Sequence, residues 1–180
     1  MKTAIIAVAG LAAAASAQSF VADLSGITVD ATAPTVLMVN NGNSGALTSI
    51  DFDITVDAGV NGANASWGSE VFIGLTHVPS GFTFTADGND IDLTDDGPND
   101  LLFGWDNAGG IFSFQGSVDL SGALADVNGD WTVTLIDQFD DFGPDHQYLS
   151  GSTITINNVP APAGLAVLGL GGLAAARRRR

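Results

Sequence analysis

The sequence has no cysteine, so no disulfide holds the fold together and no thiolate is available to bind zinc or to act as a nucleophile. Basic residues are also scarce, because five Lys and Arg stand against 20 Asp and Glu. These five are Lys2 and Arg177–Arg180, so the long central part of the chain has none. Affinity for nucleic acid comes from Lys and Arg that displace counterions from phosphates. The composition therefore excludes nucleic acid as a direct partner.

Familiar catalytic motifs are missing as well. The two histidines, His77 and His146, have no Gly-x-Ser-x-Gly nucleophile motif or His-Glu-x-x-His zinc motif near them. We therefore expect no catalytic residue and no enzymatic activity. A glycosidase needs only two carboxylates held across a cleft, and the many acidic residues leave that arrangement open. A small glycan hydrolase is kept as one alternative.

The amino terminus has the three parts of a secretory signal peptide. Lys2 supplies a positive charge, residues 4–15 are apolar and rich in alanine, and Ala15-Ser16-Ala17 precedes Gln18. The apolar run is too short to cross a bilayer, and its small-residue end suits a signal peptidase. We predict a helical signal peptide over residues 1–17, cleaved before Gln18, and hence export from a bacterial cell.

Residues 18–158 show the two-residue spacing of β-strands and no long stretch of helical period. In the segment 50–56, Ile and Phe side chains alternate with Asp51, Asp53 and Thr55, which places the acids on one face of a strand. The segment 131–135 alternates in the same way. The other expected strands are 35–39, 71–75, 81–85, 91–93, 101–105, 111–114 and 153–156. About eight to ten short strands separated by Gly, Asn and Asp turns predict one antiparallel β-sandwich of the jelly-roll kind.

The carboxyl tail changes composition at Val159. Val159-Pro160-Ala161-Pro162 leads into the apolar, Gly-rich segment 163–176, and Arg177-Arg178-Arg179-Arg180 follow. This order of parts resembles the PEP-CTERM family of exported bacterial proteins, with Ala161 in place of the usual Glu. The resemblance implies that residues 159–180 are a sorting segment, removed by an exosortase-type transpeptidase after transient membrane association. It also implies delivery to the cell surface or an exopolysaccharide matrix.

A second resemblance covers Leu47 to Ile156 and is strong only at the end of this range. Asn128-Gly129-Asp130-Trp131 begins a strand, an acidic loop with Gly143-Pro144-Asp145 follows, and residues 151–156 form a last strand. This pattern is similar to the end of the proprotein-convertase P-domain, with Tyr148 where that family has Trp. The resemblance implies a jelly-roll sandwich and no activity, since that domain is an accessory module beside a protease.

Clustered acids suggest a calcium site, because calcium takes oxygen ligands from carboxylates, amides and carbonyls. The preferred group is Asp137, Asp140, Asp141 and Asp145, and a second group lies within residues 92–100. A third group begins at Asp126, but Trp131 stands where an EF-hand loop requires Gly. For both remaining groups, the alternative is a solvated acidic loop.

Trp67 lies in the polar stretch 61–69 and is the best candidate to stack on a sugar ring, whereas Trp131 belongs to the expected core. We therefore expect a non-catalytic structural or adhesive protein of the cell surface or extracellular matrix, associated with polysaccharide. The main alternative is a calcium-dependent carbohydrate-binding module.

Overall fold

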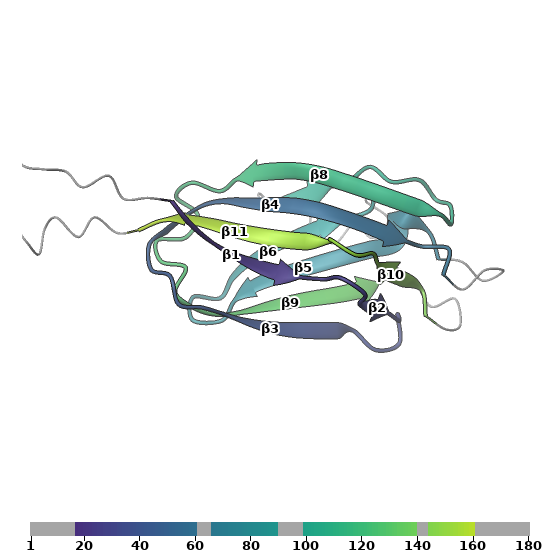
Figure 1. Ribbon diagram of the computed structural model, residues 1–180, viewed down its shortest axis with the longest axis horizontal. Coiled ribbons are helices and arrows are strands. Elements are labelled where there is room, and N and C mark those ends of the chain that lie inside the picture. Colours follow the sequence, from purple (N-terminus) through teal and green to yellow (C-terminus); the bar gives the residue numbers. More distant parts are fainter. Residues whose placement is uncertain (1–16, 61–65, 90–98, 140–143, 161–180) are drawn as a thin grey trace, which may run out of the picture.

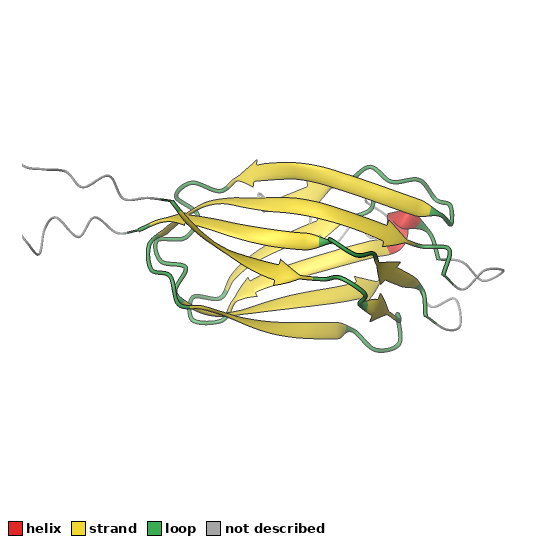
Figure 2. Ribbon diagram, viewed as in Figure 1, coloured by secondary structure: helices red, strands yellow, loops and turns green. Residues whose placement is uncertain are grey.

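The computed structural model describes residues 17–60, 66–89, 99–139 and 144–160, which form two β-sheets packed face to face (Figure 1). The strands run along the long axis of the molecule. Among the described residues, the one helix is a short 3-10 turn, η2 (Gly68–Glu70), at one end (Figure 2). The strands are β1 (Gln18–Asp23), β2 (Thr28–Val29), β3 (Thr35–Asn41), β4 (Ala46–Asp57), β5 (Val71–His77), β6 (Phe82–Asp87), β7 (Asp100–Leu102), β8 (Ile111–Asp119), β9 (Gly129–Asp137), β10 (His146–Tyr148) and β11 (Thr153–Val159).

The first sheet is built around β4, the longest strand. Its order is β1-β11-β4-β10-β2, and β8 pairs with the other edge of β4. The inward side chains of β4 are buried, whereas Asp53 is exposed and Asp51 half-buried on the outer face. There Asp51 accepts hydrogen bonds from Ser117 (2.5 Å) and Asn157 (2.7 Å) of the two neighbouring strands. The predicted separation of apolar and acidic faces on this strand is confirmed.

The second sheet has the order β3-β9-β5-β6-β7. All its pairs are antiparallel except β6 with β7, which run parallel. The all-β sandwich predicted from the sequence is confirmed, with this parallel pair as the exception to its antiparallel character. The outer face of the sheet is uncharged over its middle, where Met38, Thr132 and Thr76 lie side by side.

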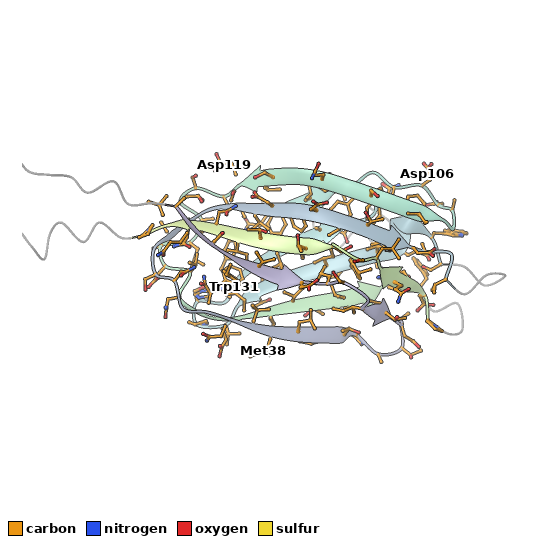
Figure 3. All side chains as sticks on the ribbon, viewed as in Figure 1. Met38, Asp106, Asp119 and Trp131 are labelled. Carbon is orange, nitrogen blue, oxygen red and sulfur yellow. The ribbon has the colours of Figure 1, made fainter. Side chains whose placement is uncertain are left out.

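The core between the sheets is made by the inward residues of both, and Trp131 is its largest member. Trp131 is fully buried, lies between the sheets (Figure 3) and donates from Nε1 to the Val127 carbonyl at 3.1 Å. Its ring packs against His77 (5.0 Å between centroids), Phe20 and Phe82. Trp131 therefore belongs to the core, as the alternation of its strand predicts.

The predicted strands agree with the observed ones at most positions, and the differences have local causes. The segment 101–105 was expected to be one strand, but β7 ends at Leu102, and Gly104 takes a positive φ of 72° that a strand does not allow. Strands β1, β2 and β10 were not predicted. β2 and β10 have two and three residues, too few to show alternation, and β1 follows directly on the predicted signal peptide. The expected strand 91–93 and all of the predicted signal helix 1–17 except Ala17 lie outside the described residues.

The two ends of the described chain leave the sandwich together. Gln18 of β1 pairs with Asn158 of β11, and Val159 pairs with Ala46 at the start of β4. Both chain ends therefore emerge at one end of the molecule, at the left of Figure 1, whereas η2 lies at the opposite end. Strand β4 spans this length with 12 residues, or about 35–40 Å. In the described part of the chain, no helix is long and apolar enough for a membrane crossing.

Candidate functional site

The end of the sandwich opposite the chain termini carries Trp67, which stands directly before η2 and has 44% of its surface exposed. The other two tryptophans are buried. Trp105 packs against Phe103 (4.7 Å) and Phe112 (5.6 Å) inside an aromatic group of the core, so it presents no free ring face. Trp67 is therefore exposed at this end, whereas Trp105 belongs to the core.

Three further large apolar side chains are exposed at the same end, namely Val60, Ile111 and Phe139. Backbone hydrogen bonds hold their segments close to Trp67. The Ala58 amide donates to the Gly110 carbonyl (2.8 Å), and the Gly68 amide donates to the Ala108 carbonyl (3.0 Å). The Gln138 amide donates to the Glu70 carbonyl (2.9 Å). We call Val60, Trp67, Ile111 and Phe139 the apolar end.

Two glycines allow the backbone that carries Trp67 to pack closely on its neighbours. A Cβ atom at Gly68 would lie 2.6 Å from the Phe112 ring, and one at Gly88 would lie 1.9 Å from the Gly68 carbonyl oxygen. A side chain at either position would force the turn away from the sandwich. Trp67 is therefore mounted on a turn that is fixed by packing and by hydrogen bonds on both sides.

Beneath the apolar end lies a buried polar cluster that joins the two sheets. Ser66 hydrogen-bonds to Asp137 and, at 3.0 Å, to Glu70. Glu70 Oε2 also accepts from the Trp67 amide at 2.9 Å. His146 Nδ1 lies 3.1 Å from Asp137 Oδ2, and all four side chains are buried. This cluster fixes η2, and with it Trp67, to the ends of β9 and β10.

The residues predicted to bind calcium are arranged differently from an open loop. Asp137 and Asp145 are both buried. Asp137 Oδ1 accepts from the Phe139 amide at 3.0 Å, and Asp145 Oδ2 accepts from the Ala31 amide at 2.6 Å. Asp140 and Asp141 lie outside the described residues, as does most of the second acidic group. Within the described ranges, no three His, Asp or Glu side chains are grouped so that they could hold a metal ion.

Tyr148, the only tyrosine, is fully buried next to this cluster and packs edge-on against His146 with 5.5 Å between ring centroids. Burial raises the pKa of Tyr148 above its ordinary value, and the nearby Asp137 raises it further. Because folding raises the pKa of Tyr148, the neutral hydroxyl contributes to the stability of the folded state. This contribution is complete below the unfolded pKa of about 10 and is lost as the pH rises above it.

Alkaline titration should show this coupling directly. We expect tyrosinate absorbance to stay absent in the folded protein at pH values where a free tyrosine ionises. It should then rise together with the loss of the folded circular-dichroism signal. A smooth one-proton titration centred near pH 10, without unfolding, would contradict the burial of Tyr148.

Both histidines are buried. His77 is buried beside Trp131, with Nδ1 2.7 Å from the Ser80 hydroxyl and Nε2 3.0 Å from the Asn128 carbonyl.

A surface hollow of about 330 Å³ lies over the loop before β11. Its lining is Ser25, Gly26, Gln147, Tyr148, Leu149 and Ser150, which contains no carboxylate.

Ser66, Glu70 and His146 were not predicted to form a cluster with Asp137. They come from different strands and turns, so no short spacing along the chain links all of them. The exposure of Ile111 was also missed, because a residue at the first position of a strand has no neighbour on one side to define its face. The sequence gives one weak indication of this cluster, because Glu70 is the only glutamate and follows Ser66 by four residues.

Comparisons with known proteins give little beyond the fold. No protein-family model matches the chain, and no curated protein matches it. Among solved structures, the chain is similar to one from a crystal structure of the Aeromonas sobria serine protease and its chaperone, with a TM-score of 0.41 and 11% identity. The match covers 81% of this chain and 27% of the other, so this chain spans about a quarter of that one. The similarity is limited to a β-rich architecture.

Proposed function

We propose that this chain is an exported, non-catalytic adhesive protein of a bacterial surface or extracellular matrix, and that its apolar end contacts polysaccharide. The observation that carries the proposal is the exposed ring of Trp67 at that end. Aromatic faces suit amphipathic ligands such as sugar rings, which combine apolar C–H surfaces with polar edges. The central domain has 20 Asp and Glu residues and no Lys or Arg, so it repels an uncharged polymer less than a polyanion.

The placement of the two chain ends supports this role. Residues 161–180 follow Pro160, which lies beside Gly45 at the end opposite Trp67. The resemblance to the PEP-CTERM tail implies that this segment directs the chain to the surface and is then removed, so attachment to the cell would lie at this end of the sandwich. A sandwich held there presents the apolar end outward, about 35–40 Å away.

The arrangement of carboxylates favours binding over hydrolysis. A glycosidase needs two carboxyl groups across an open cleft that admits the substrate and, in some cases, a water. Glu70 and Asp137 are near each other, yet both are buried and joined through the Ser66 hydroxyl. Their hydrogen bonds hold η2 in place, which is a structural task.

The test uses the fact that one tryptophan of three is exposed. A soluble quencher of fluorescence should reach Trp67, and a neutral polysaccharide should protect it. Trp67→Ala should weaken binding about tenfold, because stacking on an aromatic ring contributes about 1–1.5 kcal/mol. Trp67→Phe should retain part of the affinity, since it keeps a ring.

Stability is the control for this experiment. Trp67 is exposed, so its truncation should change the free energy of unfolding by no more than about 0.5 kcal/mol. Equal binding by the parent and Trp67→Ala, with Trp67 still open to the quencher, would remove the carbohydrate from the proposal. Protection that disappears with a calcium chelator would favour the calcium-dependent alternative instead.

Export and tail removal give a separate prediction. Mass spectrometry of surface material should find a chain that begins at Gln18 and lacks Arg177–Arg180. Replacement of Ala15 and Ala17 by large side chains should block the first cut, because the signal peptidase requires small residues there. An intact chain confined to the cytoplasm would contradict this part of the proposal.

A further inference from the structure

Strand β3 is an open edge of the second sheet. Its seven residues pair one to one with β9, from Thr35 opposite Leu135 to Asn41 opposite Gly129. In the order β3-β9-β5-β6-β7 it stands at the end, and within the described ranges no strand pairs with its other side. Its peptide groups on that side are a template for another strand.

This edge lacks the features that usually prevent strand pairing, namely charge, proline, a bulge or short length. The sequence Thr-Val-Leu-Met-Val-Asn-Asn has no charge and no proline, and its pairing with β9 continues without a break. The other edges in the described ranges are protected by charge or by short length. β1 contains Asp23, β8 ends in Asp119, β7 has three residues and begins with Asp100, and β2 has two residues.

The side chains of β3 also favour an added strand. Met38 and Val36 are 64% and 54% exposed on the outer face, where Met38 projects from the sandwich in Figure 3. On the inner face, Leu37 and Val39 are only half-buried, although they pack against the core. A strand paired to this edge would cover the exposed parts of the side chains on both faces of β3.

We propose that β3 pairs antiparallel with β3 of a second copy of this chain, about a twofold axis at Met38. An antiparallel pair centred on Met38 places Val36 opposite Asn40 of the other copy, and it is self-complementary, as a twofold interface requires. Charge selects this contact, since two such acidic molecules repel each other least where neither has a carboxylate. Asp130, which lies opposite Asn40 on the outer face, accepts a hydrogen bond from the side-chain amide of Asn40 at 2.6 Å.

The pairing does not depend on the proposed carbohydrate binding, but it has a consequence for it. Because the strands run along the long axis of the sandwich, an antiparallel pair directs the two apolar ends in opposite directions (Figure 1). A dimer that binds polysaccharide through both ends would join two polymer chains. That consequence alone rests on the proposed function.

The test is sedimentation velocity of the full chain and three variants. The parent should form a dimer that strengthens with salt, because salt screens the repulsion between acidic copies. Met38→Lys and Met38→Asp should each raise the dimer dissociation constant at least about tenfold, since like charges then face each other. An equimolar mixture of the two variants should restore the dimer. Ser113→Lys on the β8 edge should leave the dimer intact.

The tail is common to all these chains, so association through the tail alone would be unaffected by the substitutions. Recovery of the dimer in the mixture also shows that both variants are folded. A parent that is monomeric at every concentration and salt level would overturn the proposal. So would a Met38→Lys variant that associates as the parent does, or a mixture that remains monomeric.

Discussion

Trp131→Ala should lower the free energy of unfolding by about 3–5 kcal/mol. The side chain is fully buried, its Nε1 donates to the Val127 carbonyl, and its ring contacts residues from both sheets. Truncation leaves a cavity that these neighbours cannot fill. Urea unfolding followed by circular dichroism measures the change.

The matched control is Trp67→Ala, the same substitution at an exposed position. It should change the unfolding midpoint very little. A protein that tolerates Trp131→Ala as easily as Trp67→Ala would show that Trp131 is outside the core, and would make it the better candidate for ligand stacking.

Asp137→Ala should be nearly as damaging, with a loss of about 3–5 kcal/mol. The Asp137 carboxylate accepts from the Phe139 amide and hydrogen-bonds to Ser66 and His146, all at the end of the sandwich that carries Trp67. Removal leaves these polar groups buried without their partner. The turn η2 should loosen, so Trp67 should also lose affinity for polysaccharide.

Asp137→Asn is the conservative control, because it keeps the shape and one acceptor oxygen. It should cost less than Asp137→Ala. Asp53→Ala provides a surface comparison, since Asp53 is exposed on β4 and accepts one hydrogen bond, from Gln115 at 3.2 Å. Equal stability of Asp137→Ala and Asp53→Ala would show that the buried cluster does not hold the fold together.

The sandwich could be predicted from the sequence because alternation is a local property. The alternation of apolar and polar residues in 50–56 or 131–135 identifies the two faces of one strand, whatever that strand pairs with. The pairing itself could not be predicted, since β9 meets β3 and β5 through contacts that are remote along the chain. The parallel pairing of β6 with β7 could not be predicted for the same reason.

The site was predictable only in part. Trp67 stands among polar residues, and its exposure follows from that setting. The loop from Asp137 to Asp145 was predicted to bind calcium, with a solvated acidic loop as the alternative, but Asp137 is the last residue of a strand whose odd positions face inward. Counting the alternation on from Trp131 by six residues places Asp137 in the interior, where Ser66 and His146 are its partners.

Co-sedimentation shows whether the apolar end binds an uncharged polysaccharide through Trp67. The purified protein would be mixed with insoluble neutral and anionic polysaccharides, each with and without a calcium chelator. We predict that the parent sediments with a neutral polymer whether or not the chelator is present, and that Trp67→Ala remains in solution. Failure of the folded parent to sediment with any polymer, or equal sedimentation of Trp67→Ala, would contradict this proposal.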